Sequence, residues 1–214
     1  MSKPRILLGD DHSVVVKGII GLLEPDYEIV GTAENGKALV DAAVRLRPDL
    51  VVLDISMPIL NGIDAAREIK RVLPSTKLVF LSMHSSAVYL RKALEAGASG
   101  YVLKSGAAEE LREAIAAARQ GRIYVTPQFD PELMARVQSG AVPRSPVELT
   151  DRQKQILQLV AEGRQSKEIA GILHVSVKTV EFHRSRLMAK LGARSIAELT
   201  RCAIQEGLIA APGD

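Results

Sequence analysis

Three carboxylates stand directly after two short apolar runs of the chain. Asp54 follows residues 50–53, and Asp10 and Asp11 follow residues 5–9. If these runs are strands of one parallel sheet, their carboxyl ends lie at the same edge, where open α/β folds bind their ligands. Three converging carboxylates make a hard oxygen site that suits Mg²⁺ together with phosphate oxygens. The sequence therefore predicts a site that handles phosphoryl groups.

A hydroxyl and a cation follow two further apolar runs. Ser82 ends the run at residues 78–82, and Lys104 follows the run at residues 100–103. A carboxylate attacks phosphorus only when the negative charges of both groups are neutralised, which Mg²⁺ and a lysine can do. Taken singly, each residue has an ordinary explanation, because an aspartate after a strand often caps the next helix and a lysine there is often a surface residue. Only the full set predicts phosphoryl chemistry.

The elements that must position these residues alternate along the first half of the chain. Apolar and β-branched runs predict five strands, at residues 5–9, 28–33, 50–53, 78–82 and 100–103. Helical patterns follow them in turn, at residues 12–23, 36–47, 63–72, 87–96 and 107–120. Five successive strand–helix units are typical of an α/β fold with a parallel sheet.

The same residues carry a resemblance to a known family. In their order and positions, these motifs resemble the receiver domain of bacterial two-component response regulators, over roughly residues 3–120. The motifs are Asp10-Asp11, Asp54-Ile55-Ser56-Met57-Pro58, Ser82 and Gly100-Tyr101-Val102-Leu103-Lys104. The resemblance implies a flavodoxin-like, doubly wound sheet of five parallel strands. It also implies that Asp54 accepts a phosphoryl group from a sensor histidine kinase.

The resemblance implies roles for the other residues of this site. Lys104 would pair with the phosphoryl oxygens, and Ser82 would move to hydrogen-bond them. Tyr101 would change rotamer and so transmit the effect of phosphorylation to the rest of the protein. The implied ligands of Mg²⁺ are Asp11, Asp54 and the backbone carbonyl of Ser56, with Asp10 assisting.

Composition indicates the class of protein. A length of 214 residues, with 47% hydrophobic and 25% charged residues, is ordinary for a globular chain of one or two domains. The longest apolar runs are far shorter than the ~18 residues of a membrane-spanning helix, and the N-terminus lacks the pattern of a signal peptide. The single cysteine, Cys202, excludes an intrachain disulfide and a cysteine-built metal site. We expect a cytoplasmic protein.

The second half of the chain differs in charge. Acidic and basic residues cancel over residues 1–120, so the formal net charge of +3 lies in residues 121–214. Glycines and prolines recur from 121 to 147, which predicts a linker, and Asp130-Pro131 predicts a short helix near residues 131–138 within it. We therefore expect three parts, which are a domain at residues 1–120, a linker at 121–147 and a second domain at 148–214.

Capping and helical patterns predict that the second domain is small and all-α. Four helices are expected, at residues 151–162, 167–173, 177–191 and 196–206. Thr150 and Gln153 have capping-box spacing, and the short connection at residues 173–176 is typical of a helix-turn-helix. From Lys178 to Arg194, five basic residues stand against one acid. Such a cluster favours nucleic acid, although a solvated helix face is the commoner explanation when it stands alone.

A helical wheel predicts which side chains of residues 177–191 face outward. One arc holds Val177, Val180, Leu187, Met188 and Leu191, and the opposite arc holds Lys178, Phe182, Ser185 and Ala189. An exposed aromatic on a basic helix can contact a thymine methyl group; the alternative is that Phe182 packs against the linker or the first domain. His183 falls near the inner arc, as a structural histidine or a phosphate contact.

The C-terminal motifs resemble the LuxR-type helix-turn-helix. With a receiver ahead of it, the chain is similar to NarL/FixJ-class response regulators. The motifs are residues 149–153, 161–163, 167–170, Leu173, 175–176 and 179–191. Two positions depart from the family, because Gln153 stands where it often has Glu and Ser166 where it often has Asn. Both residues stay polar, so the departures concern the helix ends more than DNA binding.

By that resemblance, the helix at residues 177–191 enters the major groove of promoter DNA. The implied phosphate contacts are Lys167, Lys178 and Arg186. The candidates for contacts to bases are Glu181, Phe182 and Ser185, and Thr179 is a further candidate for DNA binding. The helix at residues 196–206 would pair two subunits. Its apolar stripe consists of Ile196, Leu199, Ala203 and the nearby Leu208, and the alternative is that this stripe only closes the domain's own core.

The resemblance of both halves implies a transcription factor that is controlled by phosphorylation, is a homodimer when phosphorylated, and is no enzyme in the turnover sense. An aspartate-nucleophile phosphatase would usually carry a second aspartate two residues after Asp54, where Ser56 stands. A nucleotide-binding enzyme would need a glycine-rich loop after the first strand, and residues 9–12 are acidic instead. The remaining alternative is a regulator of the same architecture that binds DNA independently of phosphorylation.

Overall fold

The computed structural model describes residues 3–106, 108–129, 132, 135 and 149–209. These residues form two compact units, one α/β and one all-α. The short helix expected near residues 131–138 falls largely outside the described residues. None of the helices that are described combines the length and the hydrophobicity needed to cross a lipid bilayer.

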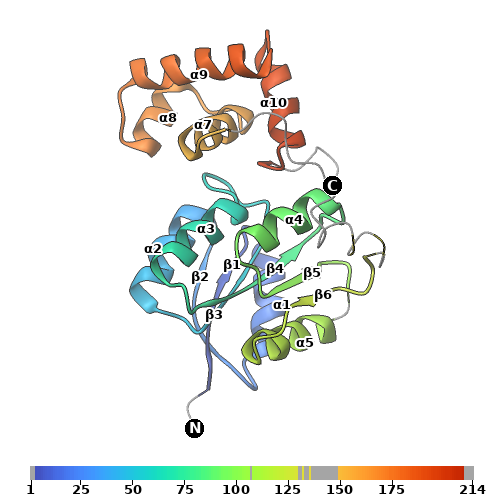
Figure 1. The fold of residues 1–214 in the computed structure, drawn as a ribbon. Coiled ribbons are helices and arrows are strands. Elements are labelled where there is room, and N and C mark those ends of the chain that lie inside the picture. The colour runs from blue at the N-terminus through green and yellow to red at the C-terminus, as the bar shows by residue number, and fades with distance from the viewer. Residues whose placement is uncertain (1–2, 107, 130–131, 133–134, 136–148, 210–214) are drawn as a thin grey trace. The chain divides into compact units, whose positions relative to one another are not determined.

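The α/β unit is built on a parallel sheet with the strand order β2-β1-β3-β4-β5-β6 (Figure 1). The strands are β1 (Arg5–Gly9), β2 (Glu28–Ala33), β3 (Leu50–Leu53), β4 (Lys77–Ser82), β5 (Gly100–Leu103) and β6 (Tyr124–Val125). Every residue of β3 and β5 is buried. That is why these runs are continuously apolar rather than alternating, as expected for strands covered on both faces.

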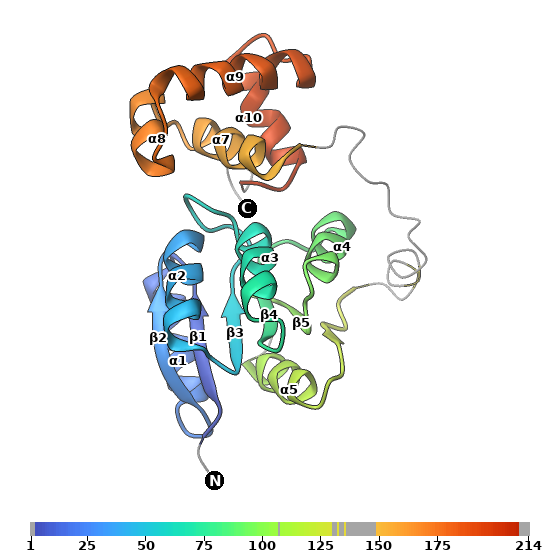
Figure 2. The same cartoon turned by 60° about the vertical axis from the view of Figure 1, so that its left-hand side comes forward.

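Five helices connect these strands and cover both faces of the sheet. They are α1 (Ser13–Leu23), α2 (Gly36–Leu46), α3 (Gly62–Val72), α4 (Ala87–Glu95) and α5 (Ala108–Arg119). Figures 1 and 2 show α2, α3 and α4 on the face opposite to α1 and α5. On the α1/α5 face, Leu23 and Ile115 pack with Ile6, Val52 and Val102 of the strands in one buried cluster. The predicted doubly wound, flavodoxin-like class is confirmed.

The strand order fixes where a site can form. From β1 the chain runs outward to β2 and then returns to β3 on the other side of β1. The carboxyl ends of β1 and β3 therefore lie at the point where the winding of the sheet reverses, which is the usual ligand position in such folds.

The sheet has one strand more than the five predicted. The sixth, β6, pairs with β5 through Gly100 and Tyr124, and it lies in the segment predicted as linker. Two residues are too few to produce a recognisable pattern, because alternation becomes a signal only over about four or more residues.

The all-α unit has the four helices that were predicted. They are α7 (Asp151–Ala161), α8 (Ser166–Leu173), α9 (Val177–Leu191) and α10 (Ile196–Gln205). Thr150 and Gln153 form the predicted capping box, and Ser176 caps α9 by accepting a hydrogen bond from the Thr179 amide. Val180 and Leu187 of α9 are fully buried in the core of this unit. Val177, predicted to lie in the same inner arc, is 44% exposed because it is the first residue of the helix.

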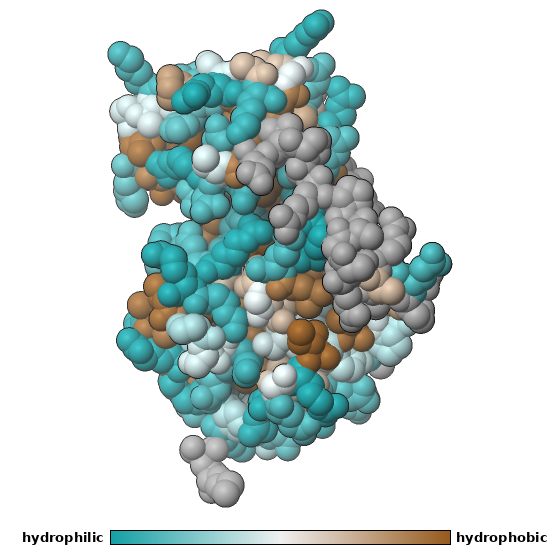
Figure 3. Space-filling model, in the orientation of Figure 1, coloured by the Kyte–Doolittle hydropathy of each residue, from teal (hydrophilic) through white to brown (hydrophobic). Residues whose placement is uncertain are grey.

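The visible surface of the described residues is mostly hydrophilic, with smaller hydrophobic patches (Figure 3). Buried apolar side chains form the cores of the two units, each within its own unit. The polar residues that could take part in chemistry are instead buried at the carboxyl edge of the sheet, among them Asp10, Asp54 and Ser82.

Candidate functional site

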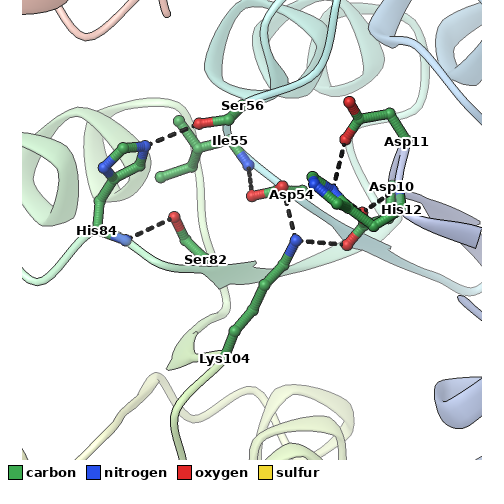
Figure 4. Close-up of polar contacts among 9 residues, drawn as sticks. All are labelled: Asp10, Asp11, His12, Asp54, Ile55, Ser56, Ser82, His84 and Lys104. Atoms are coloured by element: carbon green, nitrogen blue, oxygen red, sulfur yellow. Dashed lines mark hydrogen bonds and ion pairs between the residues drawn. The ribbon is translucent and has the colours of Figure 1, made fainter. Parts of the chain in front are cut away.

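The three predicted acids meet at the carboxyl ends of β1 and β3. The Asp54 amide donates to the Gly9 carbonyl at 2.8 Å, which joins the end of β3 to the end of β1. Lys104 comes from the end of β5, and its amide donates to the Ser82 carbonyl at the end of β4 at 2.8 Å. Figure 4 shows the side chains of Asp10, Asp54 and Lys104 turned toward one another. Four strand ends thus contribute to one site.

Lys104 connects two buried acids. Its Nζ lies 2.8 Å from Oδ2 of Asp54, as a hydrogen-bonded ion pair, and 2.7 Å from Oδ2 of Asp10. Asp10 and Asp54 are 3% and 4% exposed. Burial raises the pKa of Asp54, although Lys104 opposes this shift. For Lys104, burial lowers the pKa, but attraction to Asp54 and Asp10 outweighs it and the net shift is upward.

Both oxygens of Asp54 accept hydrogen bonds. Oδ1 accepts from the Ile55 amide at 2.6 Å, and Oδ2 accepts from Lys104. A carboxylate held from two sides has a fixed orientation, which a nucleophile requires. The site therefore has a positioned carboxylate, a cation beside it, and further acids for a metal ion.

His12 belongs to the same cluster, and sequence reasoning missed it. Its Nδ1 lies 3.1 Å from Oδ1 of Asp10 and 2.9 Å from Oδ1 of Asp11. Ligand atoms of these three residues and of Asp54 all lie within 4.8 Å of one another. The signal was available, because His12 directly follows the two aspartates. Three carboxylates at this spacing fit the oxygen ligands that Mg²⁺ prefers.

His84 joins three of the predicted site residues. Its Nε2 lies 2.8 Å from Oγ of Ser56, its amide donates to Oγ of Ser82 at 3.2 Å, and its carbonyl accepts from the Tyr101 hydroxyl at 2.7 Å. The imidazole stacks on the Tyr89 ring, with centroids 4.0 Å apart. Tyr101 is fully buried, and burial raises the pKa of its hydroxyl. His84 thus connects the Asp54 loop to Ser82 and Tyr101.

Gly62 fixes the backbone of the Asp54 loop. Its amide donates to the Ile55 carbonyl at 2.8 Å, and a Cβ placed on it would lie 1.9 Å from the Asp54 carbonyl oxygen. Gly62→Ala is therefore expected to destabilise the protein by about 2–3 kcal/mol and to slow any reaction at Asp54. Gly18→Ala, in α1 where a Cβ meets nothing within 4 Å, should be neutral or stabilise by up to ~1 kcal/mol. Equal denaturation midpoints for the two variants would contradict this reading.

The outer face of α9 carries the side chains predicted to contact DNA. Phe182 is 56% exposed, as the wheel predicted, and the Arg186 guanidinium carbon lies 5.4 Å from its ring centroid. Lys178 and Ser185 are also exposed. An arginine over an aromatic face is an attractive contact that orders both side chains. The face is thus basic with one exposed aromatic.

The other three predicted DNA contacts, Thr179, Glu181 and Lys167, each have a different local environment. Thr179 is half-buried, and its hydroxyl lies 2.8 Å from that of the cap residue Ser176. Glu181 is exposed and accepts a hydrogen bond from the Ser166 hydroxyl, at the start of α8. Lys167 is exposed on the same turn of α8 as Ser166. Ser166, one of the two departures from the family pattern, therefore orients a candidate base-reading residue.

The apolar stripe of α10 mainly closes the core of its own unit. Leu199 and Ala203 are fully buried and Leu208 is 5% exposed, all within the core cluster. Ile196 is the exception, at 50% exposed. Three of the four residues therefore fit the alternative that the stripe closes the domain's own core, and pairing of subunits through this helix stays a prediction.

Comparisons with known proteins agree with both units. Residues 6–116 match the response regulator receiver domain, and residues 147–203 match the bacterial regulatory proteins of the luxR family. The chain is similar to the transcriptional regulatory protein MctR of Rhizobium johnstonii, with 36% identity over 99% of this chain and 98% of MctR. It is also similar to the response regulator protein VraR of Staphylococcus epidermidis, with 32% identity over 96% of this chain and 98% of VraR.

A solved structure of similar fold is that of the RcsB response regulator of Salmonella typhimurium. It is 30% identical, with a TM-score of 0.65, and the match covers 96% of this chain and 99% of RcsB. The chain belongs to the response regulators that combine a receiver domain with a luxR-family DNA-binding domain. It is a transcriptional response regulator.

Proposed function

We propose that Asp54 accepts a phosphoryl group from a sensor histidine kinase, and that this modification controls promoter binding by the domain at residues 148–214. The main support for this proposal is that Lys104 forms ion pairs with the buried Asp10 and Asp54. These residues lie at the carboxyl ends of the strands, where the winding of the sheet reverses. The receiver part would extend past residue 120 to include β6 (Tyr124–Val125), and the DNA-binding part would be residues 148–214. Incubation with acetyl phosphate and Mg²⁺ followed by intact-mass analysis tests the first half of the proposal.

The acidic cluster fits Mg²⁺ by the chemistry of its donors. Asp11, Asp54 and the backbone carbonyl of Ser56 would hold the ion, and Asp10 would assist from its buried position. Bound there, Mg²⁺ would supply positive charge against the phosphoryl oxygens. Lys104 contacts both Asp10 and Asp54 and offsets part of their negative charge, so Lys104 and Mg²⁺ would share the neutralisation of the site.

The residues around Asp54 would carry out the transfer. One carboxylate oxygen of Asp54 forms a bond to phosphorus as the bond from phosphorus to the donor's leaving atom breaks, and the leaving group takes the electron pair. Lys104 then pairs with the phosphoryl oxygens, which stabilises their charge. Ser82 would exchange its hydrogen bond from the His84 amide for one to the phosphoryl group. Because Tyr101 donates to the His84 carbonyl, that movement would also reach Tyr101.

The output would be a change in DNA binding by a dimer. Solved structures of RcsB include two RcsB dimers bound to two parallel DNAs, and RcsB bound to a promoter in the presence of the phosphomimetic BeF₃⁻. We extend this mode to the present chain, acting in the cytoplasm where promoter DNA lies. Phosphorylation would favour the dimer only as far as the phosphoryl group favours that state over the other.

Substitutions on α9 should separate phosphate contacts from base contacts. Lys178→Ala is expected to weaken binding to all sites alike and to reduce the slope of log affinity against log salt by roughly 1. Glu181→Ala should relax the preference at one base position, because a good base contact is worth ~1–3 kcal/mol of discrimination. Binding to a randomised site library, measured at several salt concentrations, checks both results.

Two control variants sharpen this test. Lys37→Ala removes an exposed lysine of α2 and should change neither quantity. Ser166→Ala removes the hydrogen bond to Glu181 but keeps the carboxylate, so it should weaken the same preference less than Glu181→Ala does. If Lys178→Ala alters sequence preference while Glu181→Ala leaves it intact, the assignment of the two residues is reversed.

A further inference from the structure

The imidazole of His12 faces the acidic cluster rather than the helix that it precedes. His12 is the N-cap residue of α1, but its side chain caps no amide of that helix. Its Nδ1 instead contacts Oδ1 of Asp11 and Oδ1 of Asp10. The side chain is 62% exposed, so the imidazole can turn without disturbing the core.

The spacing of these atoms matches neighbouring ligands of one metal ion. In an octahedral complex with bonds of about 2.1 Å, adjacent ligand atoms lie about 3.0 Å apart. The distances from His12 Nδ1 to Asp11 and Asp10 are 2.9 Å and 3.1 Å. All four candidate ligand atoms lie within 4.8 Å of one another, which is close to the roughly 4.2 Å that separates opposite ligands at such bond lengths.

We infer that His12 Nδ1 is a nitrogen ligand of this site, which gives the site a preference for divalent transition-metal ions over Mg²⁺. The inference rests on the proposed function, because it uses the same acids. Mg²⁺ prefers oxygen ligands, whereas imidazole suits ions such as Zn²⁺ and Ni²⁺. As a ligand, Nδ1 would present its lone pair, and the ring proton would then sit on Nε2.

Calorimetric titration of the full chain with ZnCl₂ and, separately, with MgCl₂ tests this role. His12→Asn keeps a favourable N-cap residue for α1 and removes the imidazole. We expect the variant to bind Zn²⁺ at least about tenfold more weakly, the size of effect that metal-site substitutions commonly have. Its Mg²⁺ affinity should change less than about twofold, because oxygen ligands dominate Mg²⁺ binding. An unchanged Zn²⁺ affinity, or an equal loss for both ions, overturns the inference.

Two controls make the result specific. His174→Asn alters a histidine of the all-α unit whose backbone is left-handed, at φ 51°, a conformation that asparagine tolerates; its Zn²⁺ affinity should equal that of the wild type. Asp11→Asn should weaken binding of both ions. If the wild type binds no Mg²⁺, the proposed function fails together with the inference. If Mg²⁺ binds but Zn²⁺ affinity does not depend on His12, only the inference fails.

Discussion

Asp54→Asn is expected to reduce phosphoryl incorporation from acetyl phosphate by more than about a hundredfold, because an amide cannot replace the positioned carboxylate as the nucleophile. Asp49→Asn is the matched control. Asp49 directly precedes β3 and Asp54 directly follows it, but Asp49 is exposed and accepts a hydrogen bond from the Arg5 amide at 2.8 Å. An asparagine oxygen can accept that bond equally, so the control should be modified like the wild type.

Intact-mass analysis after a fixed incubation measures the incorporation. The wild type and Asp49→Asn should gain one phosphoryl group when Mg²⁺ is present, and neither should gain it in excess chelator. Incorporation that persists in Asp54→Asn would show that another residue is the acceptor. Incorporation that persists in chelator would show that the acids do not need a metal.

Lys104→Met is expected to destabilise the metal-free protein by about 3 kcal/mol, because removal of one partner leaves buried charge uncompensated. Asp10 and Asp54 would then share the edge of the sheet without their cation. Lys37→Met is the control, since its ion pair with Asp41 is exposed on both sides and such pairs contribute ~0–1 kcal/mol. Urea denaturation in chelator compares the two variants, and equal losses would contradict a role for Lys104 in neutralising the acids.

The deficit of Lys104→Met should depend on pH and on metal. The pKa of Asp54 is already raised by burial, and loss of Lys104 removes the cation that opposes this shift. An acid whose pKa is higher in the folded than in the unfolded state binds more protons when folded, so stability rises as pH falls through the raised pKa. The deficit should therefore be largest at neutral pH and shrink toward acidic pH. Mg²⁺ should stabilise the variant more than it stabilises the wild type.

Residue order alone predicted the edge of the sheet where the acids meet. Asp10 and Asp54 each follow an apolar run, and parallel strands bring their carboxyl ends to one edge. The contacts of His84 could not be predicted in this way. His84 lies in a loop and reaches Ser56, which is 28 residues away in the chain, and no periodic pattern encodes such a contact. The two-residue strand β6 was not predicted either, because it is too short to show an alternating pattern.

In the all-α unit, the helical periodicity of apolar residues shows which face of a helix is apolar but not what that face contacts. The wheel of α9 correctly predicted that Phe182 points outward, since one apolar arc must face the core. The stripe of α10 has the same period, yet Leu199 and Ala203 lie in the unit's own core. A core face and an interface face both require apolar residues at helical spacing, so the pattern cannot distinguish them. The contact between Ser166 and Glu181 joins two helices and depends on how those helices pack.

Phosphorylation of Asp54 is expected to change the affinity of the protein for promoter DNA. The most direct measurement is the affinity for promoter DNA at one fixed salt concentration, with and without acetyl phosphate and Mg²⁺, for the wild type and for Asp54→Asn. The phosphodonor should change the wild-type affinity by about 5- to 150-fold, the usual range of coupling between two sites, and should leave that of Asp54→Asn unchanged. A wild-type affinity that does not respond, or an equal response in Asp54→Asn, would contradict the claim and favour a regulator that binds DNA independently of phosphorylation.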